Sequence, residues 1–149
     1  MINFARILSL PRLGKMTGLG GAIARWENFR FNPPPSREEL EALAVVVGVE
    51  GDRLVEMLPP AGVGMKMEPI RLCGACYAEC PCHRIEWQLK TTEGCGHGLR
   101  LLSECPNCGA RFKIPALWVD GWCHRCFTPF SEMGKQQKFW LMQSNITEL

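Results

Sequence analysis

Two stretches, Cys105-Pro106-Asn107-Cys108-Gly109 and Cys123-His124-Arg125-Cys126, decide the fold of this chain. Each contains a C-x-x-C pair, and fourteen residues separate the two pairs. Two thiolates on one tight turn fill two corners of a tetrahedron, and a second turn supplies the other two. Gly109 follows the first pair, where such a turn favours a residue that tolerates positive φ. The spacing predicts a four-cysteine zinc site of the ribbon or knuckle type, with these ligands: Cys105, Cys108, Cys123 and Cys126.

A second zinc site is predicted earlier in the chain. The pair Cys73-Gly74-Ala75-Cys76 precedes Cys95-Gly96-His97 by eighteen residues. Together these segments offer three thiolates and one imidazole, and the expected ligands are Cys73, Cys76, Cys95 and His97. Cys80, Cys82 and His83 lie nearby and remain alternative ligands, although we favour Cys80 and Cys82 as small buried hydrophobes or free thiols. Four protein ligands at each site leave no open coordination position, so we expect structural zinc and no enzyme.

Composition bounds the class of protein. The 149 residues include nine cysteines and carry a net charge of +2. The cysteine count is odd, the cysteines form C-x-x-C pairs and no secretory signal opens the chain, so metal is favoured over disulfides. The nearly neutral charge provides no global basic field for nucleic acid, and no apolar run is long enough to span a membrane. We expect a soluble cytoplasmic protein.

The first half of the chain predicts a helical domain. Short helices are expected over residues 3–10 and 22–29, with a glycine-rich turn at 17–21 between them. The clearest helix begins at Ser36, which forms an S-x-x-E capping box with Glu39. An apolar stripe at helical spacing follows before Gly48 ends the helix: Leu40, Leu43, Ala44 and Val47. Asp52 is expected to cap a second short helix that ends at Pro59-Pro60, and the two helices predict a helix-turn-helix.

The charge of this region argues against DNA as its direct partner. Between residues 36 and 70 the chain has three basic and seven acidic residues, a net charge of −4. A recognition helix needs Lys and Arg to neutralise phosphates, and acidic residues oppose binding. The balance favours protein docking or simple packing over DNA readout.

The second half predicts short strands around the metals. Residues 84–90 alternate strictly, which places Trp87 on an apolar side and Gln88 on a polar side of a half-buried strand. Phe112 and Ile114 are expected on another strand that leads to a turn at 120–121. Trp118 and Trp122 are expected to cover the small core around the metal, His124 to be exposed, and the tail 131–149 to be helical or a docking peptide.

The predicted fold class is therefore a small α protein with a zinc ribbon, in which an N-terminal helix-turn-helix half precedes two tandem zinc fingers with short β-hairpins. The expected segments are a helical domain at 1–60, a linker at 61–70, zinc finger 1 at 71–100, zinc finger 2 at 101–130 and a tail at 131–149.

A family resemblance is carried by the order of these motifs. A helix-turn-helix half is followed by Arg71-Leu72-Cys73-Gly74-Ala75-Cys76, then by Arg84-Ile85-Glu86-Trp87-Gln88, Cys95-Gly96-His97 and the Cys105–Gly109 stretch. This order resembles the TniQ family of transposition proteins. Four further stretches narrow the resemblance to the small TniQ of type V-K CRISPR-associated transposons: Ala24-Arg25-Trp26-Glu27, Phe31-Asn32-Pro33, Pro35-Ser36 and Met57-Leu58-Pro59-Pro60-Ala61-Gly62-Val63-Gly64-Met65. Where the family has C-x-x-H at the first zinc site, this chain has Cys95-Gly96-His97, and its N-terminal segment is shorter.

The resemblance implies an adaptor with two bound Zn²⁺ ions rather than an enzyme. Its implied partners are the TnsC AAA+ ATPase filament and the Cas effector with its guide and tracr RNA, with a host ribosomal protein as a further partner. DNA would be touched only indirectly or weakly, and no membrane would be involved. The alternative function is a zinc-containing helix-turn-helix regulator that binds DNA.

Overall fold

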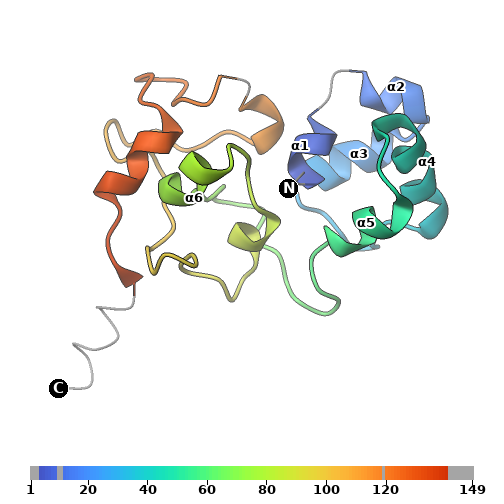
Figure 1. Ribbon diagram of the computed structural model, residues 1–149, viewed down its shortest axis with the longest axis horizontal. Coiled ribbons are helices and arrows are strands. Elements are labelled where there is room, and N and C mark those ends of the chain that lie inside the picture. Colours follow the sequence, from blue (N-terminus) through green and yellow to red (C-terminus); the bar gives the residue numbers. More distant parts are fainter. Residues whose placement is uncertain (1–3, 10–11, 119, 141–149) are drawn as a thin grey trace.

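The computed structural model describes residues 4–9, 12–118 and 120–140. It shows two groups of mostly short helices side by side, with α1 to α5 in one group and α6 in the other (Figure 1). No helix among these residues is long and apolar enough to cross a membrane. The elements, in chain order, are α1 (Phe4–Leu8), α2 (Leu13–Thr17), α3 (Gly20–Glu27), α4 (Arg37–Val47), α5 (Gly51–Glu56) and α6 (Gly74–Glu79), with the 3₁₀ helices η1 (Ile85–Gln88), η2 (Pro115–Leu117) and η3 (Phe130–Gln136).

The predicted start and end of α4 are confirmed. The backbone N–H of Glu39 donates to Ser36 Oγ at 3.1 Å, and the backbone N–H of Ser36 donates to Glu39 Oε1 at 2.9 Å, which completes the capping box. Gly48 ends the helix with a left-handed φ of 72°. The prediction that Asp52 caps α5 is wrong, because the N-cap is Glu50 without a side-chain hydrogen bond. Asp52 instead accepts an ion pair from Arg37 at 2.8 Å, which links the start of α4 to α5.

The N-terminal helices differ from the prediction in their bounds. The helix expected at 3–10 is α1, while residues 3 and 10 lie outside the described residues. The expected glycine-rich turn is narrower than predicted, because an additional helix, α2, includes Thr17 and because α3 begins at Gly20. Gly18 between them has a φ of 72°, a conformation that glycine adopts at little cost.

The prediction of β-hairpins around the metal sites is wrong for the residues that the structure describes. Only isolated antiparallel bridges occur there, for example Leu72 with Leu102 and Glu104 with Arg111. The segments predicted as strands at 84–90 and around Phe112 form the 3₁₀ helix η1 and irregular chain. Segments that are already held at both ends by ligand turns do not need a continuous ladder to bring them together.

The burial of Gln88 explains why residues 84–90 do not form the predicted strand. Strand alternation placed this side chain in solvent, but Gln88 is fully buried. Its amide nitrogen donates to the carbonyls of Lys66 and Pro69, and its Oε1 accepts from the backbone N–H of Arg71 at 2.7 Å and from His83 at 3.3 Å. One amide side chain thus satisfies polar groups from three segments, and this outweighs the alternating pattern.

The described chain has two hydrophobic cores, one mainly from its first half and one mainly from its second half, and some side chains pack against both. The helical core is built around Trp26, Leu43 and Leu54, and Ile85 from η1 belongs to it. The second core surrounds the cysteines and includes Phe29, which lies two residues after the end of α3. The packed side chains of Phe31 and Met65 belong to both. The predicted boundary at 61–70 stays a prediction, but the packing ties the two sides of it together.

The closest element packing in the cysteine-rich part is between α6 and η3. A Cβ added at Gly74 would lie 2.7 Å from the carbonyl oxygen of Phe130, and one added at Gly134 would lie 2.8 Å from the backbone nitrogen of Ala75. The backbone N–H of Gly74 also donates to the Gln137 side chain at 2.8 Å. The backbones approach so closely that only glycine fits at the crossing.

We predict that Gly74→Ala lowers the free energy of unfolding by about 1–3 kcal/mol or more, because the added methyl meets backbone atoms that cannot rotate away. Chemical denaturation of the metal-loaded chain measures this change. Gly21→Ala in α3 is the control, since a Cβ there meets nothing within 4 Å, and it should stabilise by about 0.5–1 kcal/mol. Equal effects of the two substitutions would contradict the crossing.

A buried histidine lies against aromatic residues of the second core. His83 is 2 % exposed and lies among three aromatic rings, those of Phe29 and Trp87 at 5.1 Å and that of Trp118 at 5.3 Å. Its Nε2 donates to Gln88, and its Nδ1 has no hydrogen-bond partner. Burial lowers the pKa of His83 to about 3, so the ring is neutral at pH 7.

We predict that this histidine destabilises the fold in acid. Unfolding releases a group that takes up a proton near pH 6.5, whereas the folded pKa is about 3. The stability it contributes is complete above pH 6.5 and falls by about 1.4 kcal/mol per unit as the pH decreases below that value. His83→Phe should lose less stability than the parent between pH 7.5 and 5.5, in denaturation curves with metal content checked at each pH. Parallel losses would contradict a neutral buried ring.

Candidate metal centres

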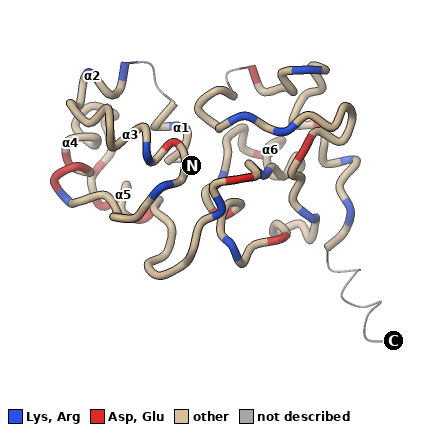
Figure 2. Tube along the Cα trace, turned by 180° about the vertical axis from the view of Figure 1, so that it is seen from behind, with Lys and Arg blue, Asp and Glu red and all other residues tan. Residues whose placement is uncertain are grey.

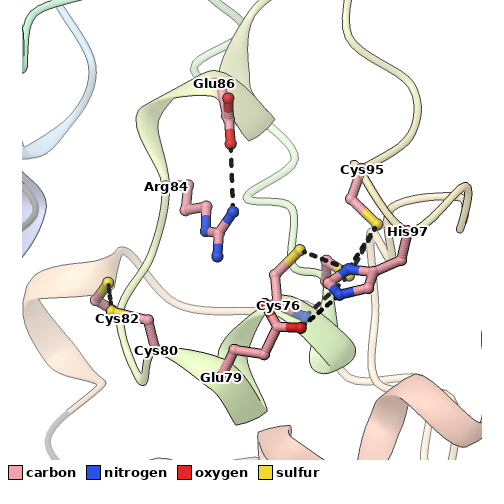
Figure 3. Close-up of polar contacts among 9 residues, drawn as sticks. Cys76, Glu79, Cys80, Cys82, Arg84, Glu86, Cys95 and His97 are labelled. Carbon is pink, nitrogen blue, oxygen red and sulfur yellow. Dashed lines mark hydrogen bonds and ion pairs between the residues drawn. The ribbon is translucent and has the colours of Figure 1, made fainter. Parts of the chain in front are cut away.

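The first predicted ligand set comes together in the structure. Four ligand atoms, from Cys73, Cys76, Cys95 and His97, lie within 4.8 Å of one another. The Sγ atoms of Cys73 and Cys95 are 3.3 Å apart, and His97 Nδ1 lies 3.3 Å from Cys76 Sγ and 3.7 Å from Cys95 Sγ (Figure 3). A tetrahedral zinc ion with Zn–S bonds of about 2.3 Å has edges of about 3.8 Å, so the ligand set fits zinc.

Two different turns supply these ligands. Cys73 is the N-cap of α6 and Cys76 lies in its first turn, so one helix start presents both thiols on the same side. The second turn closes with the backbone N–H of Cys95 donating to Leu99 at 3.0 Å and that of Gly98, at a φ of 74°, donating to Cys95. The turn brings Cys95 and His97 to the same point although only Gly96 separates them. The short C-x-H spacing therefore does not prevent the site from closing.

Glu79 is a functional residue that sequence reasoning missed. It lies one turn beyond Cys76 at the end of α6, and its Oε1 lies 2.7 Å from His97 Nε2 (Figure 3). With Nδ1 directed at the thiols, Nε2 carries the hydrogen and donates it to the carboxylate. Such a partner orients a metal-binding histidine and makes it more basic. The hydrogen bond with Glu79 also raises the pKa of His97. The i, i+3 spacing from Cys76 was the available signal.

The second predicted ligand set also comes together. The thiols of Cys105, Cys108, Cys123 and Cys126 lie within 4.8 Å of one another. Two Sγ pairs, Cys105 with Cys126 and Cys108 with Cys123, are each 3.6 Å apart. These separations are much longer than a disulfide bond of about 2.05 Å and close to a zinc tetrahedron edge. Both clusters are thus consistent with one zinc ion each, two per chain.

The second cluster is built from two turns of the same kind. In one, the N–H of Cys105 donates to Ala110 and the N–H of Gly109 donates to Cys105; in the other, Cys123 donates to Thr128 and Phe127 donates to Cys123, all at 2.8–2.9 Å. Gly109 has a φ of 77°, and Phe127 holds the equivalent place with a φ of 62°. A bulky residue in this left-handed region is strained. Phe127 is nevertheless 66 % exposed, so core packing does not explain it.

Electrostatics distinguishes the thiols within each cluster. Burial raises the pKa of Cys76 and raises that of Cys105 to about 12. Burial acts on Cys95 too, but hydrogen bonds from the Leu99 backbone and from Cys73 outweigh it and lower the pKa to about 7. The Thr128 hydroxyl, 3.1 Å from Cys126 Sγ, lowers that pKa to about 5. A metal ion binds thiolates, so loading must displace protons and metal affinity should rise with pH.

The alternative ligands lie apart from both clusters. Cys80 and Cys82 contact each other away from the first cluster in Figure 3, and His83 is enclosed by aromatic rings. His124 is exposed, as predicted. Trp118 packs against the cysteine-rich core as predicted, but the expectation for Trp122 is wrong, because it is 44 % exposed just before the second turn.

No family model matches the chain, and no curated protein matches it either. The resemblance to the TniQ family therefore rests on the motifs quoted above, and the chemistry of the two clusters rests on their geometry.

We predict that Glu79→Gln weakens zinc binding at the first site by about 10- to 100-fold, because His97 loses its orienting carboxylate. Competition with a chromophoric chelator, resolved into two affinities, measures the effect, and the second site should keep its affinity. Glu132→Gln is the matched control, because Glu132 is an exposed carboxylate on η3 outside both clusters. An unchanged first affinity would show that the carboxylate does not support the site.

Metal removal should unfold the cysteine-rich part. A structural zinc site contributes about 10–16 kcal/mol of binding free energy that is coupled to folding. After chelation, amide hydrogen exchange between residues 71 and 130 should lose its protection, while the helices α3 and α4 retain part of theirs. Metal analysis before chelation should find two zinc ions per chain. Unchanged protection after complete metal removal would contradict a metal-dependent fold.

Proposed function

We propose that this chain is a docking adaptor for RNA-guided transposition, which links a Cas effector complex to a TnsC AAA+ filament. The observation that best supports an adaptor role is that each cluster has a complete set of four protein ligands. Each cluster offers four protein ligands and no open position, which is the pattern of a structural rather than a catalytic metal site. The identity of the two partners comes from the family resemblance and is the part that the experiment must test.

The acidic surface of α4 and α5 supports protein docking over DNA readout. Figure 2 shows Asp and Glu gathered along these helices. Arg37 is paired with both Glu41, at 3.0 Å, and Asp52, so its charge is already neutralised by neighbours. A surface of this charge repels DNA phosphates and complements a basic protein surface. We therefore propose that the acidic surface of α4 and α5 binds a basic surface of a partner protein.

The exposed aromatic residues of the second cluster supply another docking surface. Trp122 and Phe127 flank the ligand turn that contains Cys123 and Cys126, and their side chains are exposed, to 44 % and 66 %. Metal coordination holds this turn rigid, so its side chains need little ordering when a partner binds. Large rigid aromatics of this kind are frequent centres of binding energy in protein interfaces.

The decisive experiment is co-sedimentation of the zinc-loaded chain with TnsC filaments assembled on duplex DNA with a nonhydrolysable ATP analogue. We expect binding to the filament, and little binding to the same duplex without TnsC. A parallel titration measures binding to bare duplex between 50 and 200 mM salt. The alternative regulator would bind bare duplex tightly and lose affinity steeply with salt. That outcome, or absence of binding to both the filament and the Cas–guide complex, would overturn the adaptor.

Phe127→Gly separates docking from stability. The left-handed backbone conformation costs Phe127 about 1 kcal/mol, and glycine adopts it without that cost. Glycine also increases the conformational entropy of the unfolded chain, which offsets part of this gain. We predict equal or slightly higher stability in denaturation curves, zinc content unchanged, and weaker binding to the filament. The matched control is Gly109→Ala, which imposes strain at the equivalent place and should destabilise. Undiminished filament binding by Phe127→Gly would exclude this side chain from the interface.

A further inference from the structure

A pair of cysteines outside both metal clusters forms a distinct chemical site. Cys80 caps the C-terminal end of α6, and Cys82 follows it across the exposed Pro81. Their Sγ atoms are 3.3 Å apart, and the backbone N–H of Cys82 donates to the carbonyl of Cys80 at 2.7 Å, which holds the tight turn (Figure 3). Two thiols held this closely can reach bonding distance with a small rotation of their side chains.

The surroundings of the pair argue against a third metal site. Among the residues that the structure describes, only the two clusters bring three or more possible ligand atoms within 4.8 Å of one another. A thiol pair alone leaves zinc two ligands short of its usual four. The geometry of this pair is better suited to bonding between its own sulfur atoms.

The two thiols differ in access. Cys82 is buried, at 8 % exposure, while Cys80 is only partly buried. Both border an open cleft of about 550 Å³ between the helical group and η1, with Met57 and Leu58 on one wall and Arg84 on the other. A small molecule can therefore reach the partly exposed Cys80 from the cleft more readily than it can reach the buried Cys82. Arg84 lines the cleft together with Glu56 and Glu86, and it forms an ion pair with Glu86 at 3.7 Å.

We propose that Cys80 and Cys82 are a thiol–disulfide exchange site that reacts with low-molecular-weight disulfides of the glutathione class while the metal clusters stay intact. The Cys80 thiolate attacks one sulfur of the small disulfide, a mixed disulfide forms, and one small thiolate leaves. Cys82 then loses its proton, its sulfur attacks Cys80 Sγ, and the second small thiolate leaves. Two cysteine thiols are oxidised to one disulfide, and the small disulfide accepts two electrons and two protons to become two thiols.

The cysteines of the clusters provide the internal comparison. When each thiolate is bound to zinc in a closed set of four, it is a weaker nucleophile than a thiolate that borders a cleft. The inference does not depend on the proposed function, because it concerns reactivity of the chain alone.

The test uses the zinc-loaded full chain in glutathione buffers of rising disulfide content. Remaining thiols are alkylated, and peptides and zinc content are measured by mass spectrometry and metal analysis. We expect a disulfide between Cys80 and Cys82 with zinc content unchanged. In Cys82→Ser and in the apolar variant Cys82→Ala, a glutathione adduct should persist on Cys80. In Cys80→Ser, modification at position 82 should be much slower.

Several results would overturn the proposal. One is oxidation of the cluster cysteines, with zinc loss, while Cys80 and Cys82 stay alkylatable. A second is a mixed disulfide that persists in the parent chain, which would show that Cys82 does not resolve it. A third is an additional metal ion per chain that is lost when both cysteines are replaced by serine, since that would make the pair a metal site.

Discussion

Convergence of four ligand atoms on one point is the constraint on which the cysteine-rich part depends. Each cluster draws its ligands from two turns that lie far apart in the sequence, and a tetrahedron with edges of about 3.8 Å leaves those turns little freedom. A zinc ion coordinated there would also contribute more free energy than a few hydrogen bonds. The chain between the turns therefore closes through single bridges such as Leu72 with Leu102, without a β-ladder. Glycine at the crossing of α6 and η3 allows the helix that bears Cys76 to pack this closely.

The second organising feature is a buried polar network at the meeting of the two cores. The Gln88 side chain hydrogen-bonds to the carbonyls of Lys66 and Pro69, to the backbone N–H of Arg71 and to the ring of His83. The Arg71 guanidinium in turn donates to the carbonyls of Leu89 and Thr92. Buried polar groups are costly unless they are paired, so this network specifies one arrangement of the linker against η1. Together with the shared side chains of Phe31 and Met65, it couples the helical group to the cysteine-rich group.

These constraints bear directly on the proposed adaptor role. Zinc bound by the second cluster would fix the turn that exposes Trp122 and Phe127, and the capping box with the Arg37 ion pairs fixes the acidic helices. Both surfaces are present before any partner arrives, which reduces the conformational entropy lost on binding. The pair Cys80–Cys82 lines a cleft of its own, outside both clusters, and its proposed chemistry is separate from theirs.

Local signals in the sequence determined the two ligand sets and the bounds of α4. The C-x-x-C spacings predict both ligand sets, and the S-x-x-E pattern with Gly48 predicts α4, because each depends on neighbours within one turn. Tertiary structure decided the rest. Residues 84–90 alternate like a strand, yet become η1 because Gln88 finds buried partners from distant segments. Asp52, which the local pattern predicts as a helix cap, instead forms an ion pair with Arg37. Glu79 becomes the partner of His97 only when α6 meets a turn eighteen residues away. Such pairings arise between segments that are distant in the chain, so no local pattern contains them.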